Sequence, residues 1–330
     1  MKTALRVLRF CLLGVAALVA VAGALFGWFL YTPAPEMPQL SGVVAKGTLE
    51  SGGLTRSYQT YLPKGLAKGA PLLLVMHGSG QSSSDIRTET GYGFERLADQ
   101  HGFAVVYPDA YTFDWNDCST IGDFSANGRA VDDVGFLDAL AVKLAAETGA
   151  DSKRVFATGV SSGGFMSIRL ALEAPARFRA VAAVSANVHA PENFKCKPAG
   201  AGTSVMLMSG TKDPLVPFDG GESSLLGLFF KGGKVRSAGQ SGQYFADLNH
   251  IPGQPAAGHI LAEAGANKEA GVEQALWRNG GRAEVELVTI KGGGHGMPQS
   301  AWRRPRLLGP SPMATDGPAM IWSFFERQRS

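Results

Sequence analysis

The chain has 330 residues, of which 45% are hydrophobic and 18% charged, with 43 glycines and 18 prolines. This apolar content is enough to fill a large core, and it excludes disordered, collagen-like and coiled-coil proteins. The formal charge of +3 comes entirely from Lys2, Arg6 and Arg9, because the other basic residues equal the acidic ones in number. The neutral body of the chain therefore gives no reason to expect a nucleic-acid partner.

The N-terminal segment predicts export. Residues 10–31 carry no charge, and as a helix rising about 1.5 Å per residue they would reach roughly 33 Å, enough to cross a bilayer core. Basic residues precede this segment, and the charge asymmetry disfavours a buried core helix. A transmembrane anchor and a cleaved signal peptide both remain open. We expect residues 1–9 in the cytoplasm, 32–45 as a linker, and the rest exported, facing the periplasm or the extracellular side or secreted after cleavage.

The cysteines fit the same compartment. Cys11 lies in the apolar segment, which leaves Cys118 and Cys196 in the exported portion. An even number of cysteines in an oxidising compartment predicts one disulfide, with two free thiols as the alternative. No Cys or His spacing suggests a metal, and no cofactor is expected.

Beyond residue 45, short apolar runs alternate with helical patterns. This alternation predicts the α/β class, with a mostly parallel, doubly wound sheet over residues 46–330. Residues 220–281 break the rhythm and are expected to form an insertion or lid region with its own helices. The predicted strands cover residues 58–62, 72–76, 103–107, 155–158, 180–184, 204–208 and 283–290, and the predicted helices lie at 95–101, after 132–133, at 162–172 and after 315–316.

A nucleophile candidate follows one of these strands. The strand at 155–158 runs into the motif GVSSGG at residues 159–164, and a helix follows. A sharp strand-to-helix turn holds a serine hydroxyl clear of the fold, and flanking glycines let two backbones pass without Cβ clashes. The G-x-S-x-G pattern alone is weak in a glycine-rich chain. Its position between a strand and a helix makes Ser161 the predicted nucleophile rather than part of an ordinary glycine turn.

A serine nucleophile needs a base and an orienting acid, which in this kind of fold follow later strands in the order serine, acid, histidine. Asp213 stands in a loop just past the strand at 204–208, and His295 stands among glycines past the strand at 283–290. We predict that His295 is the base and that Asp213 holds its imidazole. The alternative for Asp213 is a turn-forming role.

The other histidines and paired acids receive structural interpretations. His77 begins the loop HGSGQ at residues 77–81, which is placed to donate the backbone N–H of Ser79 to an oxyanion, with a second donor from Ser162. We interpret His77 itself as a support for that loop. Asp132 and Asp133 are interpreted as helix caps. Four histidines have no predicted acid partner and are interpreted as structural or surface residues: His101, His189, His250 and His259.

Taken in this order, the motifs resemble those of polyhydroxybutyrate depolymerase-type esterases, relatives of the feruloyl esterases in the α/β-hydrolase superfamily. The resemblance covers about residues 50–328, and the insertion matches poorly. It implies an α/β-hydrolase fold and a serine esterase that hydrolyses carboxylic esters through an acyl-enzyme, with Ser161, Asp213 and His295 as the triad. The amides of Ser79 and Ser162 are its implied oxyanion donors. The matching segments are residues 77–81, 131–136, 159–164, 210–217, 292–298 and 308–310.

Departures from the family pattern concern the substrate. Relatives often carry Trp-Pro two residues after the histidine, whereas Met297 stands there in this chain and Trp302 follows. Met297 and Trp302 are therefore predicted substrate contacts beside the acyl pocket. Phe229 belongs to an apolar stretch at residues 225–230, which is either a lid or an ordinary buried segment. No separate module for adsorption to solid polymer is evident, so short-chain esters, hydroxyalkanoate oligomers or aryl esters are expected in place of granular polyester.

Two other functions remain open. The same triad serves peptidases of the prolyl-oligopeptidase type, although these normally carry a propeller domain for which 330 residues leave no room. A membrane-tethered binding module with a silent triad is the second alternative. It is disfavoured because all three triad positions are filled.

Overall fold

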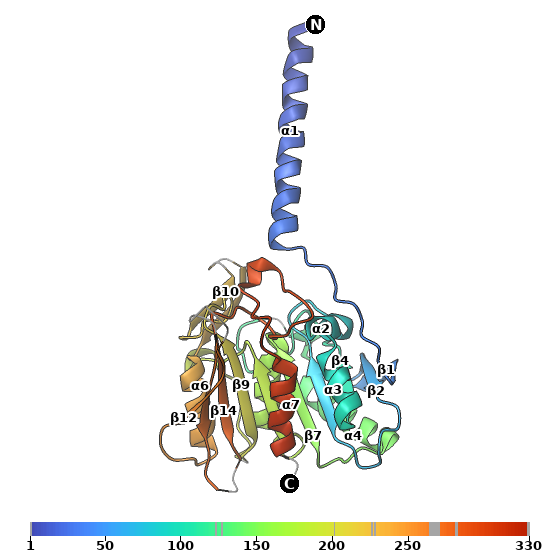
Figure 1. Ribbon diagram of the computed structural model, residues 1–330, viewed down its shortest axis with the longest axis vertical. Helices are drawn as coiled ribbons and strands as arrows, with labels where there is room; N and C mark the ends of the chain where they lie inside the picture. Colours follow the sequence, from blue (N-terminus) through green and yellow to red (C-terminus); the bar gives the residue numbers. More distant parts are fainter. Residues whose placement is uncertain are drawn as a thin grey trace.

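The computed structural model describes residues 2–122, 124–126, 128–200, 202–225, 227, 229–263, 271–280 and 283–328. At its centre lies a ten-stranded sheet (Figure 1). The strands, in their order across the sheet, are β1 (Val43–Ser51), β2 (Leu54–Leu62), β4 (Ala104–Pro108), β3 (Leu72–Met76), β7 (Val155–Val160), β8 (Ala180–Val184), β9 (Ser204–Gly210), β14 (Val285–Lys291), β13 (Gly271–Trp277) and β12 (Ala256–Glu263).

The strands from β4 to β14 in this order run parallel, and the pairs at both edges are antiparallel. The predicted α/β class and mostly parallel sheet are therefore confirmed. Because parallel strands end at one edge, the loops that follow β3, β4, β7, β8, β9 and β14 meet there. We call this edge the carboxyl edge.

Helices cover both faces of the sheet, because the side chains of each buried strand alternate between two cores. Leu72 and Leu74 face one core, and Leu73 faces the other. The first core is covered by α4 (Asp133–Thr148), α5 (Ser162–Glu173) and α6 (Ala238–Leu248). The second core is covered by α2 (Ser83–Glu89), α3 (Gly93–His101) and α7 (Gly317–Arg327).

The stretch at 220–281 is more closely joined to the sheet than an insertion with its own helices. Its described residues hold one helix, α6, which packs against β9 and β14, and two strands, β12 and β13, that extend the main sheet. Small hairpins complete the strands: β10 (Gly221–Leu225) pairs with β11 (Phe229–Val235), and β5 (Ser125–Ala126) pairs with β6 (Arg129–Ala130).

The two acids at the start of α4 play different parts. The Asp132 side chain accepts a hydrogen bond from the Gly135 amide and caps the helix, as expected. The prediction of a capping role for Asp133 is wrong, because its carboxylate is buried against the Arg56 guanidinium at 2.7 Å. Its other oxygen accepts from the Asn116 amide at 2.8 Å. Asp133 therefore fixes a loop that reaches the candidate site.

An apolar helix, α1 (Lys2–Phe29), rises from the carboxyl edge of the domain (Figure 1). Its segment Arg6–Phe29 spans 24 residues with a mean hydropathy of 2.4, and it is not buried against the rest of the chain. In length and composition it could cross a membrane, and a signal sequence near an N-terminus would have the same character.

Candidate active site

Ser161 stands on a strained turn between β7 and α5. Its φ is 56° and its ψ is −119°, a region that non-glycine residues rarely adopt. The turn is also tight: a Cβ on Gly159 would lie 2.3 Å from the Gly163 carbonyl oxygen, and a Cβ on Gly163 would lie 2.4 Å from that of Met76. Only glycine fits at these two positions, and this packing holds Ser161 at the carboxyl edge.

His295 and Asp213 form a buried pair from the loops after β14 and β9. The His295 Nδ1 atom lies 2.9 Å and 3.1 Å from the two carboxylate oxygens of Asp213. The Leu215 and Val216 amides each donate to Asp213 Oδ1 at 2.9 Å. Burial opposes ionisation of Asp213, but His295 and these amides outweigh it, so the pKa of Asp213 is lowered. An ionised Asp213 keeps the proton on Nδ1 and leaves Nε2 available as a base.

The strand end of β8 connects this pair to Ser161. The Ser161 amide donates to the Val184 carbonyl at 2.9 Å, and the hydroxyl of the next residue, Ser185, accepts from the Gly296 amide at 2.8 Å. Within the described residues, neither the Ser161 hydroxyl nor His295 Nε2 has a hydrogen-bond partner. Both groups are therefore open to a substrate or to each other.

Both ring nitrogens of His77 are hydrogen-bonded to backbone groups. Its Nδ1 donates to the Gly78 carbonyl at 2.7 Å, and its Nε2 accepts from the Ala110 amide at 3.0 Å. Burial lowers the pKa of His77, which favours the neutral ring that this arrangement requires. The Trp115 indole donates to the His77 carbonyl at 2.9 Å. His77 therefore supports its loop and is not placed to act as a base.

The predicted oxyanion donors face one cavity. Ser79, Ser161 and Ser162 are among the residues that line a cavity of about 140 Å³. Within the described chain, the amides of Ser79 and Ser162 donate no hydrogen bond, whereas the Gly78 amide donates to Gln81 Oε1 at 2.8 Å. Two unpaired N–H groups beside a serine nucleophile are what an oxyanion hole requires.

Asp114 lines the same cavity and was not predicted. Burial raises the pKa of its carboxyl group, although the neighbouring side chains of Ser79 and Ser162 favour the charged form. The Ser162 hydroxyl also accepts from the Trp115 amide at 3.0 Å. No spacing pattern in the sequence marks Asp114. The one available signal is its place four residues before a cysteine predicted to be cross-linked.

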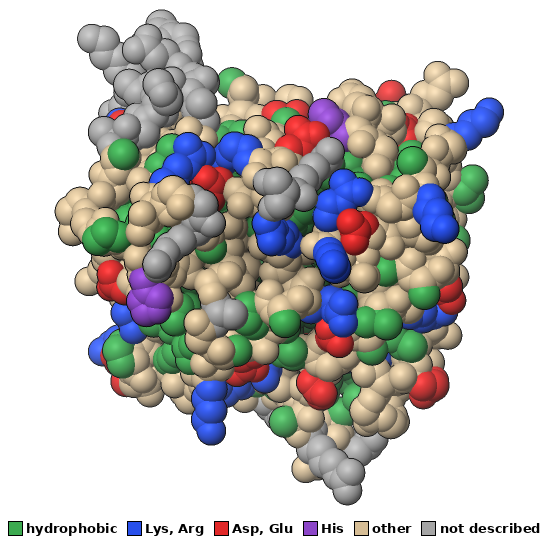
Figure 2. Space-filling model, turned by 90° about the horizontal axis from the view of Figure 1, so that it is seen from below, with side chains coloured by type: hydrophobic (Ala, Val, Ile, Leu, Met, Phe, Trp, Pro, Cys, Tyr) green, Lys and Arg blue, Asp and Glu red, His purple; other side chains and the backbone are tan. Residues whose placement is uncertain are grey.

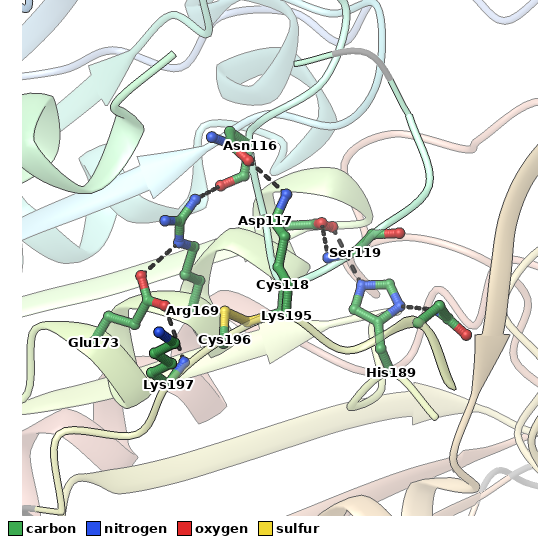
Figure 3. Close-up of a disulfide and its surroundings, with 11 residues drawn as sticks. Asn116, Asp117, Cys118, Ser119, Arg169, Glu173, His189, Lys195, Cys196 and Lys197 are labelled. Atoms are coloured by element: carbon green, nitrogen blue, oxygen red, sulfur yellow. Dashed lines mark hydrogen bonds and ion pairs between the residues drawn. A yellow bond between two sulfur atoms is a disulfide. The ribbon is translucent and has the colours of Figure 1, made fainter. Parts of the chain in front are cut away.

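A second histidine–aspartate pair lines the cavity. His189 Nε2 lies 3.5 Å from Asp117 Oδ2 (Figure 3). The His189 ring also stacks on Phe165, with the ring centroids 4.7 Å apart. The expectation that His189 has no acid partner is therefore wrong. The same correction applies to His101, which contacts Glu326 at 3.1 Å. Neither pairing was predictable, because no motif in the sequence marks Asp117 or Glu326 as the partner of a histidine.

The predicted disulfide is confirmed. Cys118 and Cys196 are bonded, 78 residues apart in sequence, next to the Asp117–His189 pair (Figure 3). Arg169 strengthens the same region, since it pairs with Glu173 and donates to the Asn116 carbonyl. The bond tethers the loop that carries Asp114 and Asp117.

The three predicted substrate contacts do not line this cavity. Met297 is 1% exposed and packs in the core beneath α7. Trp302 is half-buried in a loop, and its own backbone amide donates to Gln299 Oε1 at 2.8 Å. Phe229 is 57% exposed on the β10–β11 hairpin, which instead contributes Lys231 to the cavity wall. Two members of the predicted apolar lid, Leu226 and Leu228, lie outside the described residues.

Residues 56–221 match the family described as Esterase PHB depolymerase, and this is half of the chain. The chain belongs to that family. It is 32% identical over 193 residues to a protein of Nocardia uniformis subsp. tsuyamanensis named as an esterase, NocK, covering 58% of this chain and 54% of that one. It is 32% identical over 133 residues to Feruloyl esterase B of Neurospora crassa, covering 40% and 44%.

This member of the esterase PHB depolymerase family spans about half the length of the curated relatives it matches. Among solved structures, the acetyl xylan esterase from Aspergillus awamori superposes with a TM-score of 0.54 at 16% identity, over 76% of this chain and 94% of that one. At this identity the likeness concerns the fold, and it supports the α/β-hydrolase fold.

Proposed function

We propose that the protein is a serine esterase that hydrolyses carboxylic esters through an acyl-enzyme. The observation that carries the proposal is the buried His295–Asp213 pair, held at the carboxyl edge where Ser161 stands on its strained turn. The family match and the esterase names of the relatives support the reaction class.

In this mechanism His295 Nε2 removes the proton from Ser161 as the serine oxygen attacks the ester carbonyl. Asp213 keeps the imidazole in the required tautomer and stabilises its charged form. The amides of Ser79 and Ser162 bind the oxyanion, and loss of one such donor costs about 2.7–4 kcal/mol. The alcohol then leaves with the proton from His295, and a water activated by the same ring cleaves the acyl-enzyme.

The cavity favours a compact or oligomeric substrate. Its wall combines apolar side chains such as Phe165 and Val216 with the polar side chains of Asp114, Ser119 and Lys231. Esters with short acyl, hydroxyalkanoate or aryl groups fit such a mixed surface, because each offers apolar atoms together with an oxygen that can be hydrogen-bonded.

We further propose that α1 anchors the enzyme in a membrane, with the catalytic domain on the exported side. The apolar span Arg6–Phe29 and the Cys118–Cys196 disulfide support this placement. Disulfides persist in oxidising compartments, and a bond in the α/β domain is consistent with a domain that has left the cytoplasm.

Ser161→Ala tests the esterase assignment. We expect hydrolysis of p-nitrophenyl acetate and butyrate to fall by a factor on the order of 10⁴ or more, because no nucleophile remains. The circular dichroism spectrum should stay unchanged, since Ser161 makes no side-chain hydrogen bond within the described residues. Substantial residual activity would refute the assignment.

A fluorophosphonate probe separates the alternatives. The wild-type chain should gain the mass of one phosphonyl group, and Ser161→Ala should gain none. An unlabelled wild type would point to a binding module with a silent triad. Labelling combined with faster cleavage of a prolyl p-nitroanilide than of p-nitrophenyl esters would point to a peptidase.

A further inference from the structure

The end of α1 contacts the loop beside the candidate base. The Arg306 guanidinium lies 3.9 Å from the ring centroid of Trp28 and donates to the Trp28 carbonyl at 2.8 Å. Arg306 begins the short helix η2 (Arg306–Leu308), and the Leu308 carbonyl accepts from the His295 amide at 2.7 Å. The apolar helix is therefore tied, through one short segment, to the loop that carries His295.

This contact gives the catalytic domain an orientation. Figure 1 shows α1 rising from the end of the domain where η2 and β10 lie, whereas the C-terminus lies at the opposite end. The end beneath α1 is the carboxyl edge, and the cavity that Ser161 lines is built from its loops. A bilayer spanned by α1 would consequently lie over the site and not behind it.

Most of the large hydrophobic side chains that are exposed on the catalytic domain lie at this end. From β1 onward, seven large hydrophobic side chains among the described residues are exposed. Two of them, Val43 and Val142, lie on β1 and α4. The other five, exposed by between 38% and 58%, lie on loops or hairpins of the carboxyl edge; we call them the apolar rim: Tyr111, Phe113, Ile121, Phe229 and Met313.

The opposite end has a different character. Figure 2, which views the molecule from that end, shows Lys, Arg, Asp and Glu side chains spread over the face, with hydrophobic side chains interspersed among them. Exposed apolar groups that gather at one end of a molecule mark a contact surface, and single ones scattered elsewhere do not. Ile121 belongs both to the rim and to the cavity wall, so the contact surface continues into the site.

We propose that the carboxyl edge rests on the membrane that α1 spans, and that the site takes esters of amphiphiles presented at the bilayer surface. The proposal rests on the proposed esterase function and on anchoring by α1. An aromatic residue at the helix end, such as Trp28, belongs at the level of the lipid headgroups. Arg306, stacked on that ring, then places η2 at the same depth, at the end of the domain where the apolar rim lies. Burial of rim side chains in the interface stabilises this orientation, at about 25 cal/mol per Å² of apolar surface.

Fluorescence quenching tests the orientation without reference to activity. In the full chain, Cys11→Ser removes the free thiol, and single cysteines are introduced by Tyr111→Cys on the rim or Val142→Cys on α4. Each is labelled with an environment-sensitive dye and reconstituted into phosphatidylcholine vesicles with brominated acyl chains. We expect strong quenching at position 111 and little at position 142.

Two outcomes of this test would overturn the proposal. Equal, weak quenching at both positions would place the carboxyl edge in solution. If the dye at position 111 is protected from quenching to an extent that depends on the protein-to-lipid ratio, the rim forms a contact between two copies of the chain. Adding Arg306→Ala should reduce quenching at position 111, because the contact that fixes the domain to α1 is lost.

Hydrolysis of a vesicle-borne ester tests the substrate class. The rim variant combines Tyr111→Ser with Met313→Ser, and the control combines Val43→Ser with Val142→Ser, so each loses two exposed apolar side chains. In full-length protein in vesicles, the rim variant should release butyrate from bilayer-partitioned hexadecyl butyrate, whose acyl group is short, about fivefold more slowly, as expected for roughly 1 kcal/mol of lost interfacial burial. Its rate on soluble p-nitrophenyl acetate should stay within about twofold of wild type, and the control should match wild type on both esters.

An equal loss on both esters, or an equal loss in the rim and control variants, would contradict the membrane-presented substrate. A wild type that cleaves neither ester would instead refute the esterase function, and the quenching result would still decide the orientation. The two failures are therefore distinguishable.

Discussion

Two buried histidine–aspartate pairs lie at the carboxyl edge, and they are built differently. Asp213 lies 2.9 Å from His295, and two backbone amides fix one of its oxygens. Asp117 lies 3.5 Å from His189 and receives one amide, that of Ser119. The second ring nitrogen of His189 faces Asn193 at 3.3 Å, whereas that of His295 has no partner among the described residues. The free nitrogen, rather than the presence of an acid, separates a candidate base from a structural histidine.

The largest expected effect tests this comparison directly. Asp213→Asn should lower kcat for p-nitrophenyl butyrate by about 10⁴-fold, because an amide no longer selects the tautomer with Nε2 unprotonated. Asp117→Asn is the matched control, and it should lower kcat by less than about tenfold. Steady-state kinetics of both variants provide the measurement. A large loss in Asp117→Asn would mean that the second pair takes part in the chemistry.

The disulfide lies beside the Asp117–His189 pair, so its removal should affect the stability of the protein more than its catalysis. Replacing Cys118 and Cys196 by serine should lower the free energy of unfolding by about 2–5 kcal/mol, since the bond closes a long loop. Guanidinium unfolding measures the loss, and Cys11→Ser, which removes an unpaired thiol, should leave it unchanged. The bond tethers the Asp117 loop and not the Asp213 loop. We therefore expect folded protein without the bond to retain most of its kcat, and a kcat as low as that of Asp213→Asn would contradict this division.

Relief of the backbone strain at Ser161 should raise the free energy of unfolding, by less than loss of the disulfide lowers it. Ser161→Gly should raise the free energy of unfolding by about 1 kcal/mol over Ser161→Ala, because glycine adopts φ 56° and ψ −119° without strain but loses more entropy on folding. Chemical denaturation of the two inactive variants measures the difference. A glycine variant no more stable than the alanine variant would show that the turn stores no strain.

Local patterns accounted for much of the fold and for the pairing of Asp213 with His295. The strand at 155–158, the glycines around Ser161 and the acid and base loops each carry their signal within a few residues, and parallel strands bring such loops to one edge. Asp114 and the partner of His189 were not predictable in this way. Their roles depend on how the loop after β4 folds back across the cavity, which the disulfide and the buried Arg56–Asp133 pair determine.

The prediction of Met297 as a substrate contact is wrong for a related reason, whereas Trp302 and Phe229 stay predictions. The resemblance predicts Met297 beside the acyl pocket, because relatives often carry Trp-Pro two residues after the histidine, but in this chain the methionine packs in the core beneath α7. Nearness in sequence to a catalytic residue does not determine which side of a loop a side chain takes. The apolar rim likewise emerged only once Tyr111, Phe229 and Met313, far apart in the chain, were seen at one end of the molecule.

The smallest expected effect concerns the pH dependence of stability. The pKa of Asp213 is lowered in the folded protein, so its ionised form adds stability above its unfolded pKa of about 3.9. That contribution is lost as the pH falls through the lower, folded value. The difference in unfolding free energy between wild type and Asp213→Asn should therefore be constant near neutral pH and shrink below about pH 4. Urea unfolding of both proteins between neutral and acidic pH measures it. A difference that does not change with pH would mean that the amides and His295 do not favour the charged carboxylate, and the basis for assigning Nε2 as the base would be lost.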